Sequence, residues 1–506
     1  MMSLLLFLVT VISRMPFSSR FLYHMDSVHF ALALDDYNIA LHQPHPPGYF
    51  LYVMFGRLLR LFISDANTVF VSISMLFSGL MIVAVYYVGR ELFGKKTGLL
   101  AALIALTSPN IWFHGEVALT YIVEAFFSTA SAFLCWKVYK GDHRYLWLSA
   151  VTLAAAGGVR QNTALFLLPL WLFSIKYVPP KKMMLAIGLF SISCLFWFFP
   201  MIRMTGGWDV YTGAFRELWL FNTGHNTVFD KGLPVLLYYA SALFDFTIFG
   251  ITAGVLPLLF VTYVLIRKRR VKYLDNGTVL FFTLWISPSV LFYLMIFIHP
   301  ANPGYALIFL PALIILIAAA IGYMSNELKE ILKKDFLAPL LCLVIFTNLY
   351  FFFFIGHPVS YSEIRHHGNR LTALLNEIRH FDAADTALFS LPYVFYGPKQ
   401  FIYYLPEYYV YQVDAKVAPN GETRKTFWGK DRITYQNETI ILPEDIRHFM
   451  AMFISDDIDR TKEIHNITIK QIRNTPFSIV HGDISLVNRI YPRLKMGSLK
   501  NETGGF

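Results

Sequence analysis

The stretch RFLYHMDSVHFALALDDYNIALHQPHPPGYFLY, residues 20–52, lies between a first hydrophobic segment and a much longer hydrophobic region. It gathers three aspartates, four histidines and three prolines in a chain that is otherwise strongly apolar. Loops held by a rigid scaffold often carry binding and catalytic residues. We therefore expect this stretch to be the first loop across a membrane and to hold the chemistry.

The composition is that of a polytopic membrane protein. Of the 506 residues, 56% are hydrophobic and only 15% are charged, whereas soluble domains carry about 25% charge. The net charge of +10 is expected of basic residues that flank membrane spans and set orientation, so it does not indicate nucleic-acid binding. The three cysteines lie in apolar runs and form no disulfide or metal-thiolate framework.

Hydrophobic segments predict about eleven spans, the first of them short against the ~20 residues that a span needs. A cleaved signal peptide is the alternative for this first segment, but no Lys or Arg precedes it. The predicted spans are 1–12, 69–88, 99–113, 117–138, 146–159, 163–175, 183–202, one within 233–266, 279–298, 305–321 and 336–355.

The charge of the loops predicts their side. The loops 90–96, 137–144, 176–182, 267–272 and 329–334 are all basic, and the loops between them are not. By the positive-inside rule the basic loops are cytoplasmic. The first loop and the chain after Ile355 are then on the outer face. We expect a multi-pass protein of a prokaryotic plasma membrane, with the endoplasmic reticulum as the alternative.

The chain after residue 355 changes to a mixed polar and apolar composition. Residues 363–381 have the spacing of an amphipathic helix, with Leu371, Leu374, Leu375 and Ile378 on one stripe. Predicted strands are 386–391, 408–413, 439–442, 478–480 and 485–487. The sequence thus predicts a polytopic α-helical membrane domain, 1–355, followed by a small α/β or α+β extracytoplasmic domain, 356–506.

Asp26 begins a segment, 27–38, with the spacing of a short helix lying in the membrane interface. The apolar side of that helix would hold Val28, Ala31, Leu32 and Ile39, and the wet side Asp35 and Asp36. Asp26 has two readings. It either caps the helix or acts as a general base on an acceptor hydroxyl.

His45-Pro46-Pro47-Gly48 predicts a stiff turn into the next helical region. A turn alone does not require His45, which could bind a phosphate or a sugar. A metal site with His24 and His29 is conceivable, but the spacing matches no standard metal motif. We therefore assign no metal ligand, and a divalent metal remains an open possibility.

Ionisable residues also occur at the edges of later spans. Glu116 opens the predicted fourth span, and Glu124 lies deeper in it, where an ionisable group indicates function. Arg160 falls between two spans and has three readings: it snorkels, pairs with Glu124, or holds a phosphate. His299 starts the tight turn HPANPGY before the predicted tenth span.

These motifs resemble the GT-C superfamily of polyprenyl-phosphate-sugar-dependent glycosyltransferases. The pattern Asp26-Ser27…His45-Pro46-Pro47-Gly48-Tyr49 is most similar to a DUF2723-like branch related to protein O-mannosyltransferases and lipid A aminoarabinose transferases. The segment GEVALTY from Gly115 and the turn HPANPGY from His299 are also similar. The resemblance covers roughly residues 1–355.

The resemblance implies an inverting transfer of a sugar from a polyprenyl phosphate to a protein, lipid or glycan acceptor. It implies that Asp26 is the catalytic base, that Glu116 is a second acidic residue of the site, and that His45 contacts the donor phosphate. Arg160 and His299 are nominated for the donor from charge and side alone. The first loop lacks an Asp-x-Asp motif, which puts metal dependence in doubt.

A polytopic transporter or lipid flippase is the alternative function. Transporters commonly show internal repeats and charged groups near the midplane. Here the polar groups concentrate at the outer edge and the sequence has no evident repeat. A structural or receptor-like protein would leave the polar first loop unexplained. We therefore favour the enzyme.

Overall fold

The computed structural model describes residues 1–224, 226–268, 275–391, 393–413, 427–428, 434–435, 439–454, 458, 464–491 and 495–497. The chain divides into two compact units. The first comprises Met1–Arg20, Ala33–Ala40 and Pro46–Ile364, and the second comprises Phe21–Leu32, Leu41–His45 and Arg365–Phe506. The assignment of separate membrane and extracytoplasmic domains to 1–355 and 356–506 remains a prediction.

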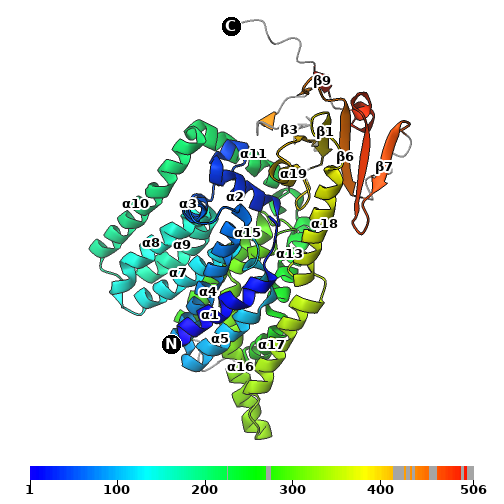
Figure 1. Ribbon diagram of the computed structural model, residues 1–506. Helices are drawn as coiled ribbons and strands as arrows, with labels where there is room; N and C mark the ends of the chain where they lie inside the picture. Colours follow the sequence, from blue (N-terminus) through cyan, green and yellow to red (C-terminus); the bar gives the residue numbers. More distant parts are fainter. Residues whose placement is uncertain are drawn as a thin grey trace. The chain divides into compact units, whose positions relative to one another are not determined.

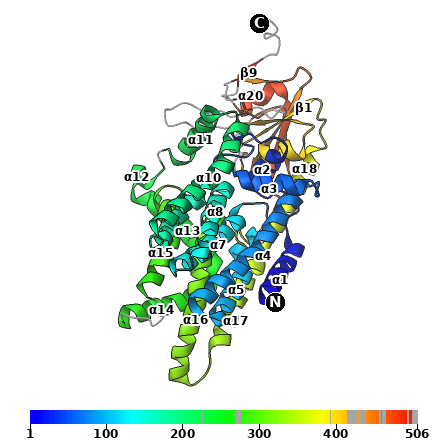
Figure 2. The ribbon, with the colours of Figure 1, turned by 90° about the vertical axis from the view of Figure 1, so that its left-hand side faces the viewer.

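The first unit is a bundle of long helices that run side by side (Figures 1 and 2). Its α-helices are α1 (Met2–Arg14), α3 (Phe50–Arg60), α4 (Ala66–Phe93), α5 (Lys95–Thr107), α6 (Pro109–His114), α7 (Tyr121–Tyr139), α8 (Leu146–Val159), α9 (Gln161–Ile175), α10 (Pro180–Thr205), α11 (Trp208–Thr223), α12 (Val228–Lys231), α13 (Leu233–Ile251), α14 (Val255–Lys268), α15 (Asn276–Met295), α16 (Leu310–Leu332) and α17 (Leu337–Phe354). Short 3-10 turns η1 (Met15–Phe17), η3 (His143–Tyr145), η4 (Thr252–Gly254) and η5 (Pro303–Ile308) join them.

Six helical segments in the described part of the chain are long and apolar enough to cross a membrane. They are Ala66–Phe93, Pro180–Thr205, Leu233–Val264, Asn276–Met295, Leu310–Leu332 and Leu337–Phe354, with the shorter apolar helices Met2–Phe17 and Gln161–Ile175 beside them. The polytopic helical fold is therefore confirmed, and the number of eleven spans stays a prediction.

Some stretches that look continuously apolar in the sequence are interrupted or shortened as helices in the structure. The predicted span 99–113 is two helices, α5 and α6, which meet at Ser108. The region 233–266 is α13 and α14 with η4 between them. Residues 117–120 precede α7, so Glu124 lies in the first turn of that helix and not two turns inside it.

Polar side chains join the broken helices to their neighbours. The Ser108 hydroxyl donates to the Gly250 carbonyl at 2.6 Å. The Ser128 hydroxyl donates to the Ile308 carbonyl at 2.6 Å, and the indole of Trp285 donates to that same hydroxyl at 2.8 Å. Small polar residues that hydrogen-bond between helices are typical of membrane bundles, where helix association gains little from the hydrophobic effect.

The first loop forms α2 (Met25–Asp35) and η2 (Ile39–Leu41), and two of its segments, Phe21–Leu32 and Leu41–His45, belong to the second unit. A helix is present where a short interfacial helix was predicted, but it starts and ends earlier than 27–38, and its place in the interface stays a prediction. Its expected lipid-facing residues Val28, Ala31 and Leu32 are buried, which makes that part of the prediction wrong. Asp35 and Asp36 are exposed, as expected.

The second unit contains a five-stranded sheet in the order β2-β1-β6-β8-β7. Its strands are β1 (Thr386–Ser390), β2 (Tyr409–Gln412), β6 (His448–Ile454), β7 (Ile467–Gln471) and β8 (Phe477–Asp483). Strands β1 and β2 are parallel, as are β1 and β6, while β8 runs antiparallel to both β6 and β7. Two short pairs are β3 (Phe427–Trp428) with β4 (Thr434–Tyr435), and β5 (Thr439–Ile441) with β9 (Lys495–Gly497).

Successive residues of a strand point to opposite faces of the sheet. Apolar residues on both faces of this sheet pack into two cores that include helices. The stripe Leu371, Leu374, Leu375 and Ile378 of α18 (Tyr361–Ile378) packs into one core with Leu388, Val410 and Ile479, which confirms the predicted amphipathic helix. The other core contains Phe389, Tyr411 and Val480 with Val487 of α20 (Val487–Ile490). A short helix, α19 (Pro398–Tyr404), precedes β2.

One predicted strand was wrong. Residues 485–487 fall in the 3-10 turn η7 (Ile484–Leu486) and α20, because the Asp483 carboxylate accepts the Ser485 backbone N–H at 2.9 Å and turns the chain. Strands β6 and β7 were not predicted. The mixed α and β character of this region is confirmed.

Candidate functional site

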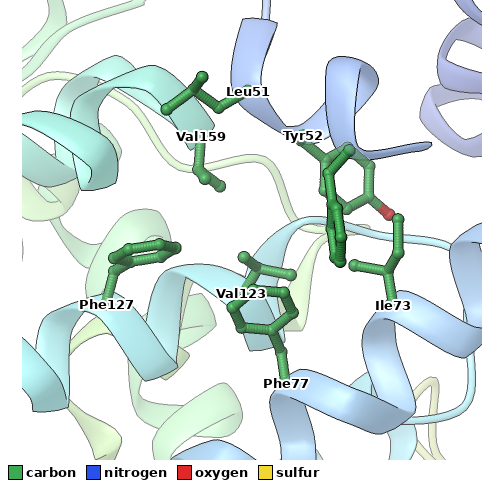
Figure 3. Close-up of a pocket in the computed structure, with 8 residues that line it drawn as sticks. Leu51, Tyr52, Ile73, Phe77, Val123, Phe127 and Val159 are labelled. Carbon is green, nitrogen blue, oxygen red and sulfur yellow. The ribbon is translucent and has the colours of Figure 1, made fainter. Parts of the chain in front are cut away.

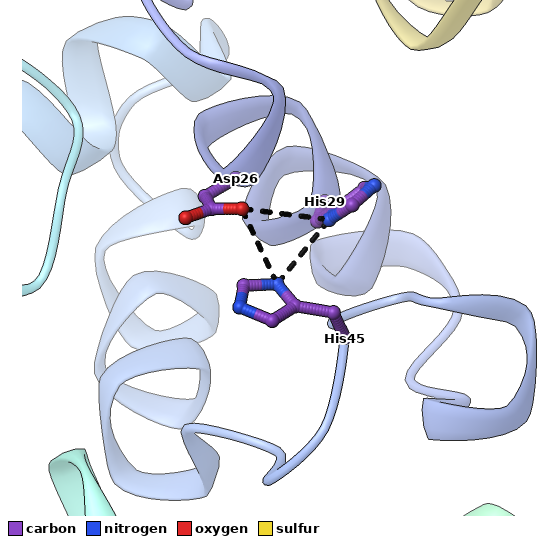
Figure 4. A group of neighbouring side chains, drawn as sticks. All are labelled: Asp26, His29 and His45. Atoms are coloured by element: carbon purple, nitrogen blue, oxygen red, sulfur yellow. Dashed lines mark hydrogen bonds and ion pairs between the residues drawn. The ribbon is translucent and has the colours of Figure 1, made fainter. Parts of the chain in front are cut away.

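The first loop brings a carboxylate and two imidazoles together within the second unit. Asp26 and His29 come from α2, and His45 comes from the proline-rich segment that follows (Figure 4). Asp26 Oδ1 lies 4.0 Å from His29 Nδ1 and 3.6 Å from His45 Nδ1. The two Nδ1 atoms are 3.2 Å apart. Asp26 and His45, both predicted from sequence, are thus neighbours, and His29 is a partner that the prediction did not select.

The start of α2 explains how Asp26 is oriented. The residue before the helix is His24, whose Nδ1 accepts the backbone N–H of Asp26 at 3.0 Å. The same Nδ1 lies 3.4 Å from Asp26 Oδ2. Asp26 therefore lies in the first turn of α2 and not at the N-cap position. In the first turn the positive end of the helix dipole favours the ionised carboxylate.

Two imidazoles of this loop, those of His29 and His42, favour their neutral form. Burial lowers the pKa of His29 well below its ordinary value, and the nearby Lys399 ammonium adds to this effect. The same two causes lower the pKa of His42 to about 3. A neutral imidazole offers a lone pair to a proton or to a metal ion.

One donor atom from each of Asp26, His29 and His45 lies within 4.8 Å of the others, which makes these residues a possible set of metal ligands. Sequence spacing did not indicate such a set. The signal available was the i, i+3 spacing of Asp26 and His29, which places both on one side of a helix. The contribution of His45 depends on the path of the loop, which sequence spacing does not give.

Arg160 is brought together with Glu124 in the first unit. Its Nη1 donates to Glu124 Oε2 at 3.1 Å, and the Thr163 hydroxyl donates to Glu124 Oε1 at 2.8 Å. The guanidinium lies over the rings of Tyr121 and Tyr305, at 4.5 and 5.2 Å from their centroids. Of the three readings of Arg160, pairing with Glu124 is confirmed.

Glu116 lies in a different part of the first unit. Its side chain is fully buried and accepts a hydrogen bond from the indole N–H of Trp112. The guanidinium of Arg14 lies 4.0 Å from the centroid of that indole. The role of Glu116 as a second catalytic acid remains a prediction.

His299 lies in the turn before η5, as the sequence predicts. Its Nδ1 accepts the backbone N–H of Ala301 at 3.2 Å, and the residue is partly exposed. The role of His299 in binding the donor remains a prediction. The five predicted residues therefore fall in two units: Asp26 and His45 in the second, and Glu116, Arg160 and His299 in the first.

The first unit also has an apolar pocket that sequence inspection did not identify (Figure 3). It contains about 470 Å³ of empty space, including its open side. Its lining residues come from α3, α4, α7 and α8 and are Leu51, Tyr52, Phe55, Ile73, Phe77, Val123, Phe127 and Val159. No periodicity within one helix indicates this pocket, because four helices contribute to it.

Residues 44–202 match the family described as dolichyl-phosphate-mannose-protein mannosyltransferase. Together with the helical fold, the match over residues 44–202 supports a membrane glycosyltransferase of the GT-C superfamily. That range includes His45, Glu116 and Arg160 but neither Asp26 nor His299. No curated protein sequence matches this chain.

Two solved structures share the fold over nearly the whole chain. ArnT from Cupriavidus metallidurans bound to undecaprenyl phosphate is 13% identical with a TM-score of 0.59, and the match covers 96% of this chain and 98% of that one. ArnT from the same organism in the apo state is 11% identical with a TM-score of 0.56, over the same shares of the two chains. At these identities the likeness establishes the fold.

Proposed function

We propose that this protein transfers a sugar from a polyprenyl-phosphate donor to an acceptor at the outer face of a prokaryotic plasma membrane. The observation that carries this proposal is the Asp26 carboxylate in the first turn of α2, with His24, His29 and His45 around it. The side chain of Asp26 is 14% exposed, so a substrate hydroxyl can reach it. The fold shared with ArnT and the family match over residues 44–202 support a glycosyltransferase reaction for this carboxylate.

The proposed reaction is a single displacement at the anomeric carbon. The acceptor hydroxyl attacks this carbon while the bond from the carbon to the phosphate oxygen breaks. Asp26 takes the hydroxyl proton as general base, and polyprenyl phosphate leaves with the bonding electrons. Attack from the side opposite the leaving group inverts the anomeric configuration.

The leaving phosphate gains negative charge as the bond breaks, so hydrogen-bond donors and cations directed at it would lower the barrier. In our proposal His45 supplies a donor to this phosphate, and Arg160 and His299 are further candidates. Glu116 remains the candidate for a second acid. Arg160 already pairs with Glu124. To bind a phosphate as well, its guanidinium would have to contact both groups or exchange Glu124 for the phosphate.

The apolar pocket supports a lipid-linked donor. Its described lining offers aliphatic and aromatic side chains, which suit the isoprene units of a polyprenyl chain because burial of apolar surface is favourable. ArnT from Cupriavidus metallidurans, which shares the fold, was solved bound to undecaprenyl phosphate. We therefore propose that the pocket binds part of the polyprenyl tail.

A transporter or flippase is the second candidate, and the buried Glu124–Arg160 pair favours it. Ionisable residues inside membrane bundles often mark the path of a substrate or an ion. A transporter would lose flux when Glu124 is changed and would tolerate a change of Asp26. The enzyme would instead lose sugar transfer when Asp26 is changed.

The test is sugar transfer by the purified Asp26→Asn variant, supplied with labelled polyprenyl-phosphate sugars. The amide keeps the shape of the side chain but cannot accept the proton, so we expect transfer to fall by roughly 10²–10⁴-fold. Asp36→Asn is the matched control, because Asp36 is an exposed aspartate of the same loop, and it should retain full activity. Full transfer by a folded Asp26→Asn protein would exclude Asp26 as the base.

A further inference from the structure

We infer that Asp26, His29 and His45 form a binding site for one divalent transition metal ion of the zinc class. This inference does not rest on the proposed sugar transfer, because metal binding is measured on the purified protein itself. It goes beyond the sequence interpretation, which assigned no metal ligand.

The distances between the three donor atoms fit such an ion. They form a triangle with sides of 3.2, 3.6 and 4.0 Å. The point equidistant from the corners of this triangle lies about 2.1 Å from each of them, by plane geometry on those three sides. Zinc bonds to imidazole nitrogen at about 2.0–2.1 Å and to carboxylate oxygen at about 2.0–2.2 Å. One ion can therefore contact all three atoms without a large rearrangement.

The chemistry of the donors selects the class of metal. Two imidazoles and one carboxylate suit zinc and its first-row neighbours. Calcium and magnesium require oxygen ligands, and calcium takes six to eight of them. The two nitrogens therefore disfavour the alkaline-earth ions.

The surroundings hold the ligands in position. Asp26 and His29 are one helical turn apart on α2, and the His45 ring lies 6.0 Å from the ring of Phe30 on the same helix. The second oxygen of Asp26 faces His24 Nδ1 at 3.4 Å. The same His24 Nδ1 accepts the Asp26 backbone N–H at 3.0 Å, which fixes the start of the helix that carries Asp26 and His29.

The exposure of the ligands indicates an open site. His29 is 3% exposed, whereas His45 and Asp26 are 13% and 14% exposed. Three protein ligands with solvent access to a fourth position are the arrangement of catalytic zinc sites, whereas structural sites have four protein ligands. The ion would then be able to accept a water molecule or an anionic oxygen of a ligand.

The test is metal binding by the full-length protein in detergent, first stripped with a chelator and then titrated with Co²⁺ and Zn²⁺. We expect one equivalent of metal by elemental analysis and Co²⁺ absorption bands typical of low coordination number. His29→Gln and His45→Gln should each weaken binding by at least about tenfold, since loss of even a second-sphere partner costs 10–100-fold. His380→Gln, at an exposed histidine of the same unit, is the matched control and should bind like the wild type.

Two results would overturn the inference. One is a wild-type protein that binds less than a stoichiometric amount of metal, in which case the two imidazoles only hydrogen-bond to each other. The other is metal binding that is unchanged in the His29→Gln and His45→Gln proteins, which would place the ion elsewhere. Because the wild-type stoichiometry and the Co²⁺ spectrum need no variant, the metal site can be tested even if a variant misfolds.

The outcomes for the metal site and for the transferase are separable. Metal bound by a protein whose Asp26→Asn variant still transfers sugar would refute the proposed function alone. A protein that binds no metal but loses transfer in Asp26→Asn would refute the metal site alone.

Discussion

The ion pair of Arg160 and Glu124 illustrates how burial raises the free-energy cost of losing one charged partner. The Glu124 side chain is fully buried and that of Arg160 is 7% exposed. Two charges removed from water in this way are tolerated only when they are paired and hydrogen-bonded. Here the Thr163 hydroxyl donates to Glu124, and the Arg160 guanidinium lies over the rings of Tyr121 and Tyr305.

Removal of one partner should therefore be costly. We predict that Glu124→Ala lowers the free energy of unfolding by about 3–5 kcal/mol, because the Arg160 charge is left buried and uncompensated. The measurement is thermal unfolding of the purified protein in detergent.

Glu91→Ala is the matched control for Glu124→Ala. Glu91 pairs with Lys137 at 2.8 Å, but its side chain is 29% exposed, so its loss should cost no more than about 1 kcal/mol. Equal stability of the Glu124→Ala and Glu91→Ala proteins would show that the buried pair contributes no more than a surface pair.

At the scale of elements, the turn from the first loop into α3 depends on one glycine. Gly48 has a φ of +119°, a conformation that residues with a Cβ rarely adopt. A Cβ added there would lie 2.7–2.9 Å from side-chain atoms of Ile39, Met201 and Tyr37. The Tyr37 hydroxyl donates to the Gly48 carbonyl at 2.6 Å, which fixes the turn further.

We predict that Gly48→Ala destabilises the protein by about 1–3 kcal/mol, the usual cost of a residue forced into a rare backbone conformation. Gly213→Ala is the control, because Gly213 lies inside α11 with nothing within 4 Å of an added Cβ. That change should be neutral or stabilising, since alanine is the better helix former. Unfolding temperatures of the two proteins that do not differ would contradict this account of the turn.

The lengths of the elements show which local features sequence can predict. Hydropathy predicted the long helices α4, α10 and α17 closely, because each is a nearly uninterrupted apolar run. It did not predict the break between α5 and α6. That break occurs at Ser108, whose hydroxyl bonds to Gly250 more than a hundred residues away. A contact so distant in sequence leaves no local pattern.

At the scale of the whole molecule, the apolar pocket exists only because α3, α4, α7 and α8 pack together. If it holds the polyprenyl tail, filling it should weaken donor binding without disturbing the rest of the fold. Val159, at the end of α8, lines the pocket and is a suitable position for such a change.

We predict that Val159→Phe raises the KM for the polyprenyl-phosphate donor by about tenfold, the effect of losing burial of roughly two methylene groups. Val151→Phe is the matched control, with the same substitution on the same helix at a side chain that is 42% exposed. It should leave the KM unchanged. A normal KM for a folded Val159→Phe protein would place the lipid tail elsewhere.

The sequence by itself determined that this is a multi-pass helical membrane protein with a mixed α and β region near its C-terminal end. It also singled out the first loop, because a cluster of polar residues in an apolar chain is visible without coordinates. These properties depend on composition and on periodicity along the chain, which local sequence carries.

Only the tertiary structure decided which residues are neighbours. It joined His29 and His45 to Asp26, paired Arg160 with Glu124, buried Glu116 beside Trp112, and assembled the apolar pocket from four helices. The physical reason is that a ligand set or an ion pair depends on distances of a few ångströms between side chains. Those distances follow from packing among segments that are far apart in the chain.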